Sequence, residues 1–144
     1  MRRLFITAFI YLVAGLASGV FYREFTKFND FPEGGYTQLA VVHTHLLSLG
    51  VLVFLIVLAL EKLFRLSQSR RLFEWFFWVY NAGMVLSCAM FVWHGCLTVL
   101  GKESGPMIAG IAGIGHIALS AGLILVFVAL GRALRRDRAE APAV

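Results

Sequence analysis

The sequence VVHTHLLSLG, residues 41–50, places two histidines inside a long apolar segment. Such a segment suits a membrane-spanning helix, which needs about 20 predominantly apolar residues. Ionisable side chains in a spanning helix are costly in lipid, so they usually face the interior of a helix bundle and mark a site. The function of the chain therefore depends on what His43 and His45 face.

The composition places the whole chain in a membrane. Of its 144 residues, 60% are hydrophobic and only 15% are charged, which is too apolar for an ordinary soluble domain. Four apolar segments of spanning length occur, at about residues 4–21, 37–60, 72–100 and 107–130. The sequence predicts one all-α domain over residues 1–144, an integral membrane four-helix bundle with up-down-up-down topology. We expect the end of the chain, residues 139–144, to be disordered.

The placement of lysine and arginine predicts the orientation. Positive charge collects at Arg2 and Arg3, in the loop 62–71 and in the tail 132–138, and the topology puts all three on one side. The positive-inside rule assigns this side to the cytoplasm, with both termini and the tail 132–144. We expect a multi-pass protein of the bacterial inner membrane, with the lipid bilayer as its partner. No basic stripe alternates with exposed aromatic residues, so we expect no nucleic-acid binding.

All four histidines fall at one level of the predicted bundle. At about 1.5 Å per residue, His43 and His45 lie about 9–14 Å below the outer end of the second span. By the same rise, His94 lies about 9 Å below the end of the third span, and His116 about 14–15 Å below the start of the fourth. All four therefore belong to the outer half of the membrane. His43 and His45 point to opposite sides of their helix, because they are about 200° apart.

A b-type haem is the cofactor that this arrangement favours. A haem needs one or two imidazoles, apolar walls and space, which a four-helix bundle supplies from facing helices. We expect His43 and His116 to be the axial ligands, with His45 and His94 as supporting partners or as ligands of a second metal or haem. Arg23 lies above the histidine level, where it can pair with haem propionates. On the fourth span, small residues surround His116 at helical spacing and leave room for a large flat group; they are Ala109, Gly113 and Ser120.

Two other interpretations stay open. Copper or zinc prefers three or four converging ligands, which His45 and His94 could supply with Met90 or Cys96. Alternatively, the histidines only tie helices together by hydrogen bonds, in a structural bundle without a cofactor. Gly15 and Gly19 in the first span have the spacing that lets two helices approach closely, which would allow a homo-oligomer but is also common in single spans. No Cys-x-x-Cys-His motif occurs, so covalent c-type haem attachment is excluded.

Two resemblances to known families add to these expectations. Residues 42–50 resemble the second-span histidine motif in the catalytic subunit of haem–copper oxygen and nitric oxide reductases, and GIGH, residues 113–116, is similar to a later histidine-bearing span. The first match implies that His43 ligates a low-spin haem b, with His45 at the third position of the motif. The whole chain, including FYREFTKF, residues 21–28, and GIAGIGH, residues 110–116, also resembles a family of small four-span bacterial membrane proteins of unknown function, which implies its fold and location.

The sequence predicts a carrier of electrons or a ligand sensor, not an enzyme acting on its own. No Ser/His/Asp set, carboxylate pair or phosphate-binding loop occurs in it. The chain also lacks the further histidines and the row of buried carboxylates that oxygen reduction and proton pumping need. We therefore expect a haem that serves one-electron transfer or ligand sensing, together with a redox partner that the sequence does not identify.

Overall fold

The computed structural model describes residues 1–140, and it confirms an all-α chain without strands over these residues. Its four long helices are α1 (Arg2–Phe28), a second helix over Leu39–Phe64, α4 (Arg70–Val99) and α5 (Pro106–Glu140). A short 3₁₀ turn, η2 (Leu66–Gln68), precedes α4. All four helices are long and apolar enough to cross a membrane. The composition and the lengths of the helices are therefore those of a multi-pass membrane protein.

The helices extend further than the apolar segments that predict them. α1 continues from residue 21 to Phe28, and α5 continues from residue 130 to Glu140. Each apolar segment ends where charged residues begin. Arginine, lysine and glutamate are nevertheless good helix formers, so the helix continues beyond the apolar segment. Ala139 and Glu140 thus belong to α5, contrary to the expected disorder. Residues 141–144, the rest of that expected tail, lie outside the described residues.

The second helix changes its hydrogen-bonding pattern in the middle. It begins as α2 (Leu39–His45), widens into the π-helix η1 (Leu46–Leu52) and ends as α3 (Val53–Phe64). The N–H of Val53 donates to the carbonyl of Ser48, five residues earlier. π-Helical segments are rare and occur frequently at functional sites. This one begins directly after His45.

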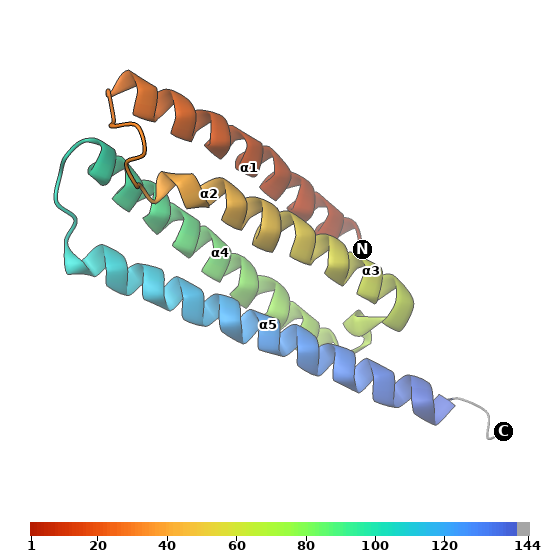
Figure 1. Ribbon diagram of the computed structural model, residues 1–144. Helices are drawn as coiled ribbons and strands as arrows, with labels where there is room; N and C mark the ends of the chain where they lie inside the picture. The colour runs from red at the N-terminus through yellow and green to blue at the C-terminus, as the bar shows by residue number, and fades with distance from the viewer. Residues whose placement is uncertain (141–144) are drawn as a thin grey trace.

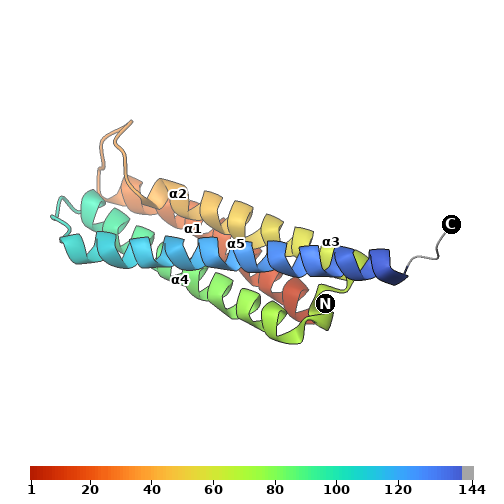
Figure 2. The ribbon, with the colours of Figure 1, turned by 90° about the horizontal axis from the view of Figure 1, so that it is seen from below.

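Consecutive helices run antiparallel and lie in the order α1, α2–α3, α4 and α5 (Figure 1). The view from below places α5 nearest the reader and α1 behind the second helix (Figure 2). Both described ends of the chain therefore lie toward the same end of the bundle, opposite the loops 29–38 and 100–105 (Figure 1). α1 packs mainly on the second helix and α5 mainly on α4, so α1 and α5 are the two outer helices of the bundle.

Two glycines let α4 contact its neighbours closely. A Cβ atom on Gly83 would lie 2.7 Å from the backbone nitrogen of Leu119 in α5. A Cβ atom on Gly95 would lie 2.6 Å from the backbone nitrogen of Leu39, at the start of α2. Small residues allow such backbone contact between helices in membranes. α4 is therefore the helix against which α2 and α5 are both positioned.

Aromatic rings fill the half of the core near the termini. The Phe54 ring of α3 is fully buried, and its centroid lies 5.7 Å from that of Tyr80 and 6.2 Å from that of Phe76. Tyr11 of α1 stacks on the same ring at 5.8 Å, and its hydroxyl donates to Asn81 Oδ1 at 2.7 Å. This cluster joins α1, α3 and α4, while the histidine level of the bundle lies beyond it.

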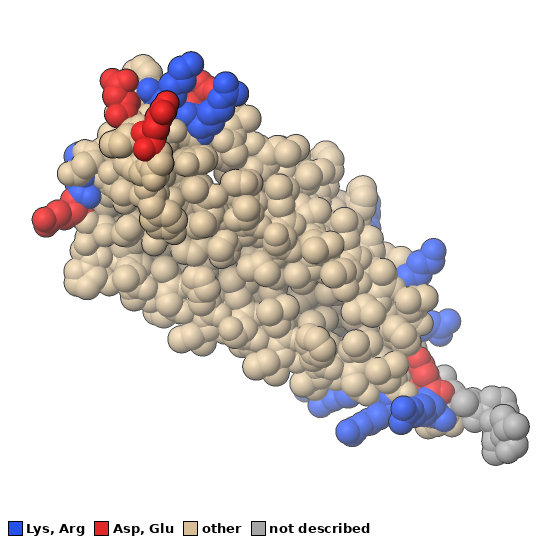
Figure 3. Space-filling view, in the orientation of Figure 1, with Lys and Arg blue, Asp and Glu red and all other residues tan. Residues whose placement is uncertain are grey.

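Charged side chains mark the two ends of the bundle (Figure 3). The end that carries the N-terminus and the loop 65–69 holds ten of the thirteen lysines and arginines, namely Arg2, Arg3, Lys62, Arg65, Arg70, Arg71, Arg132, Arg135, Arg136 and Arg138. We call it the basic end. The opposite end holds the other three, Arg23, Lys27 and Lys102, among acidic residues.

Candidate functional site

His45 and His116 lie close together on two different helices. The centroid of the His45 ring in α2 is 6.3 Å from that of His116 in α5, with the ring planes at 84°. The Phe91 ring of α4 contacts both, at 4.9 Å from His45 and 5.6 Å from His116. Three helices therefore contribute one ring each to a compact cluster, which we call the His45–His116 site.

Both imidazoles hold the same tautomer in the same way. The Nδ1 atom of His45 lies 2.9 Å from the carbonyl oxygen of Val41, four residues earlier on its own helix. The Nδ1 atom of His116 makes the matching contact with the carbonyl of Ala112, also at 2.9 Å. Because a carbonyl can only accept, each Nδ1 carries the proton and donates it. In the neutral ring each Nε2 then keeps a lone pair, and this is the form of imidazole that binds a metal.

The site opens toward the surface of the bundle. His116 is exposed and His45 is half-buried, while Phe91 is buried beneath them. The backbone of α5 comes closest to the second helix at α3. At the level of the histidines the two backbones are farther apart, and the His45 and His116 rings lie between them. The small residues expected around His116 lie on the same exposed face of α5; they are Ala109, Gly113 and Ser120. A ligand could therefore reach the imidazoles from the lipid side.

His43 lies on another side of its helix and faces α1. A Cβ atom on Gly19 of α1 would lie 3.9 Å from the Cβ of His43. The Nδ1 atom of His43 is buried and has no hydrogen-bond partner among the described residues. The expected opposition of His43 and His45 is thus seen, but it is His45 that the structure brings to His116. The sequence pattern could not choose between them, because it does not say which helix packs on which face.

Gly15 and Gly19 contact the second helix of the same chain. A Cβ atom on Gly15 would lie 2.8 Å from a side-chain carbon of Leu47. Gly15 is buried and Gly19 is half-buried. The close approach expected from their spacing is therefore used inside the chain, between α1 and the π-helix.

His94 and Arg23 do not join the His45–His116 site. The Nδ1 of His94 lies 3.5 Å from the hydroxyl of Thr98, one turn later in α4. Among the aromatic contacts of residues 1–140, none connects His94 with another histidine. Arg23 is exposed at the end of α1, the helix farthest from α5, and its ionic partner is Glu24 at 3.6 Å. The roles expected for these two residues stay predictions.

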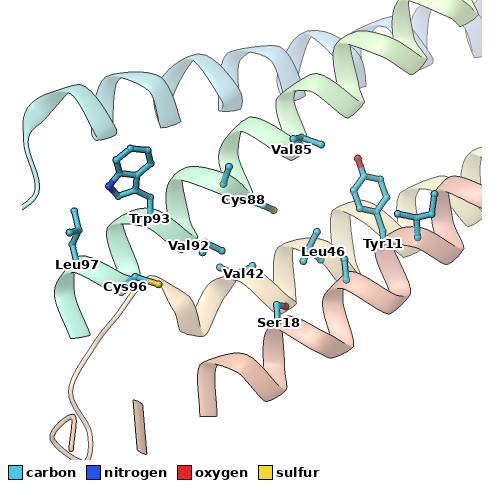
Figure 4. A pocket seen from close by; sticks show the side chains of 13 residues that line it. Tyr11, Ser18, Val42, Leu46, Val85, Cys88, Val92, Trp93, Cys96 and Leu97 are labelled. Carbon is cyan, nitrogen blue, oxygen red and sulfur yellow. The ribbon is translucent and has the colours of Figure 1, made fainter. Parts of the chain in front are cut away.

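The donor set for copper or zinc is small. Within the described part of the chain, no group of three or more His, Cys, Asp or Glu side chains is close enough to share an ion. Cys96, one of the expected third ligands, instead lines a groove of about 800 Å³ between α1 and α4 (Figure 4). The floor of this groove is formed by Val42 and Leu46 of the second helix, and none of the four histidines lines it. Cys96 and His45 therefore serve different surfaces.

Two parts of this region were absent from the sequence-based expectations. The π-helix has no sequence pattern of its own, because the wider turn depends on contacts with other helices. Phe91 was missed as well, although it lies three residues before His94 and so close to its helical face. An aromatic residue at that spacing from a half-buried histidine is the one feature that could have pointed to it.

The chain matches the family model described as "Protein of unknown function (DUF2871)" over residues 1–133. It belongs to this family. The match confirms the expected membership of a family of unknown function, whereas the resemblance of residues 42–50 to haem–copper oxidases stays a prediction. No curated protein and no solved structure match the chain.

Proposed function

We propose that this protein binds a b-type haem between His45 and His116 and uses it for one-electron transfer or for sensing a small ligand. The observation that carries the proposal is the pair of imidazoles on two helices, with ring centroids 6.3 Å apart and each Nδ1 held by a backbone carbonyl. Metal–nitrogen bonds of about 2.0–2.1 Å on either side of one metal atom are compatible with this spacing. Two imidazoles are also the complete set of axial ligands that such a haem takes from a protein.

The surroundings of the two rings support the same choice. The backbone carbonyls of Val41 and Ala112 hold each ring in place and make its Nε2 a stronger donor. Phe91 and the lipid-facing side chains of α5 keep the site apolar, which suits a porphyrin. A bound haem would supply reversible one-electron chemistry, or would bind a gas or another small ligand that displaces one of the two imidazoles.

The Phe91 ring limits the room for a porphyrin. It contacts both imidazoles, so it occupies space that a flat macrocycle between them would need. Haem binding therefore requires the Phe91 side chain to turn away. The same observation favours a second candidate, a single copper or zinc ion between His45 and His116, because an ion needs no such movement. That ion would receive only two ligands from the chain, which is fewer than zinc or copper prefers.

The location follows from the charge distribution. We infer that the basic end faces the cytoplasm of a bacterium, since an excess of lysine and arginine marks the cytoplasmic side of inner-membrane proteins. The His45–His116 site then lies in the outer half of the membrane. Electrons or ligands would reach it from the outer side or through the lipid.

The visible spectrum and the metal content of the purified full-length protein test the proposal. We expect a Soret band and sharp reduced bands after expression with added haem precursor. His45→Ala and His116→Ala should each abolish them, whereas His43→Ala, which removes an imidazole facing α1, should retain them. Copper or zinc in place of haem, lost in the same two variants, would favour the single ion. A colourless protein without either metal after haem supplementation would leave the structural bundle as the remaining interpretation.

A further inference from the structure

A second site lies at the basic end, on the opposite side of the aromatic core from the histidines. It is an open surface cavity of about 490 Å³ over the first turns of α4, lined by residues of this one helix, Arg70, Arg71, Glu74, Trp75 and Trp78. Both arginines are exposed, and the two indole rings are 65% and 63% exposed. The cavity thus combines two cations with two large amphipathic rings.

The charge of this cavity is positive, because its one carboxylate is already neutralised. The guanidinium of Arg3 donates to both oxygens of Glu74, at 2.7 and 3.2 Å, and also lies 4.1 Å from the Phe77 ring centroid. Such a two-pronged pair is geometrically specific and holds the carboxylate in place. Among the side chains that the structure describes, neither Arg70 nor Arg71 has an ionic partner. The cavity therefore presents two uncompensated positive charges.

We propose that this cavity binds the headgroup of an anionic phospholipid. The phosphate would pair with Arg70 and Arg71, since guanidinium groups match the geometry of phosphate oxygens. Trp75 and Trp78 would contact the glycerol and the first carbons of the chains, because indole rings prefer the boundary between headgroups and hydrocarbon. A soluble phosphate would use the arginines alone and gain nothing from the two indoles. Basic residues just cytoplasmic of a spanning helix attract anionic lipids, each by about 1 kcal/mol.

This proposal does not rest on haem or metal binding. It rests on the charge of the cavity and on its place at the end of the bundle that holds ten of the thirteen cations. It adds a lipid-binding role to a different part of the protein. The expected preference for an anionic over a zwitterionic lipid is about fivefold for each arginine.

Quenching of tryptophan fluorescence tests the proposal in vesicles. The full-length chain carrying Trp93→Phe retains only Trp75 and Trp78 as reporters, because the sequence has three tryptophans. Phosphatidylglycerol with brominated chains is compared with brominated phosphatidylcholine, each titrated into vesicles of the unbrominated zwitterionic lipid. We expect stronger quenching by phosphatidylglycerol at equal content, and loss of this preference in the Arg70→Gln, Arg71→Gln double variant.

A matched double variant separates a site from general surface charge. Arg132→Gln, Arg135→Gln removes the same charge from exposed residues of α5 that do not line the cavity, and it should keep the preference. Equal quenching by the two lipids in the parent protein, or an equal loss in both double variants, would overturn the proposal. Displacement of the lipid by millimolar inorganic phosphate, but not by sodium chloride of the same ionic strength, would also overturn it by assigning the site to a free anion.

Discussion

The hydroxyl of Tyr80 in α4 donates a hydrogen bond to the backbone carbonyl of Leu49, 2.9 Å away within the π-helix η1. Tyr80 is fully buried, and its ring belongs to the aromatic cluster around Phe54. Carbonyls in a wide turn have poorly placed partners within their own helix, so a donor from a neighbouring helix stabilises the turn. This bond therefore links the unusual part of the second helix to α4.

Tyr80→Phe should destabilise the protein by about 1–2 kcal/mol, because it leaves the carbonyl of Leu49 without this donor. Reversible unfolding in mixed detergent micelles, followed by circular dichroism, measures the change. Tyr36→Phe is the matched control, since Tyr36 is 71% exposed and the loss of its hydroxyl should change stability by less than about 0.5 kcal/mol. Equal effects of the two substitutions would show that the Tyr80 bond contributes nothing to stability.

Phe91→Leu should raise the haem content of the His45–His116 site. The smaller side chain removes the ring that contacts both imidazoles, so a porphyrin gains room. We expect more haem per protein, measured by the pyridine haemochrome assay, with the axial pair and hence the band positions unchanged. Phe77→Leu provides the control, because that ring is also buried but contacts Phe54 in the core. A lower haem content in Phe91→Leu alone would mean that the Phe91 ring supports the cofactor.

Gly83→Ala should separate α4 from α5. The added methyl group would lie 2.7 Å from the backbone of Leu119 and 2.8 Å from that of Gly115, and crowding of this kind costs about 1–3 kcal/mol. Gly110→Ala makes the same chemical change in α5, where the methyl group meets no atom of another helix within 4 Å, and should be neutral or stabilising by up to about 1 kcal/mol. Thermal unfolding in one detergent compares the two. The prediction fails if Gly83→Ala is as stable as the parent protein.

Cysteine labelling should show the basic end inside the cell. In a chain with Cys88→Ala and Cys96→Ala, Gln68→Cys reports on the loop before α4 and Glu103→Cys on the loop between α4 and α5; both positions are exposed. We expect an impermeant maleimide to label intact bacteria only through Glu103→Cys, since the positive-inside rule places residue 68 in the cytoplasm. Permeabilised cells should label at both positions. Labelling of residue 68 alone in intact cells would reverse the proposed orientation.

The number and type of the helices could be predicted because hydrophobic length is a local property. Each of the four apolar segments corresponds to one helix of the structure. The ends were less predictable, since charged residues such as Arg23 continue a helix beyond its apolar part. The opposition of His43 and His45 also followed from helical geometry alone.

The partners of those histidines could not be predicted, because they depend on how the helices pack. Gly19 lets α1 pack against His43. Gly83 lets α5 pack closely on α4, and Gly95 does the same for α2. Contacts of this kind join residues distant in the chain, and no periodicity encodes them. The π-helix could not be predicted for the same reason. The hydrogen-bond donor to its Leu49 carbonyl is Tyr80, which lies thirty-one positions later in the chain.

The π-helix also indicates where members of this family can differ in length. A wide turn accommodates one residue more than the α-helical turn it replaces. A relative that lacks one residue between positions 46 and 52 could close the turn into regular helix and still present His45 and Phe54 to the same neighbours. A deletion elsewhere in the second helix would rotate every later side chain by about 100°. Alignment gaps in this helix should therefore gather at η1.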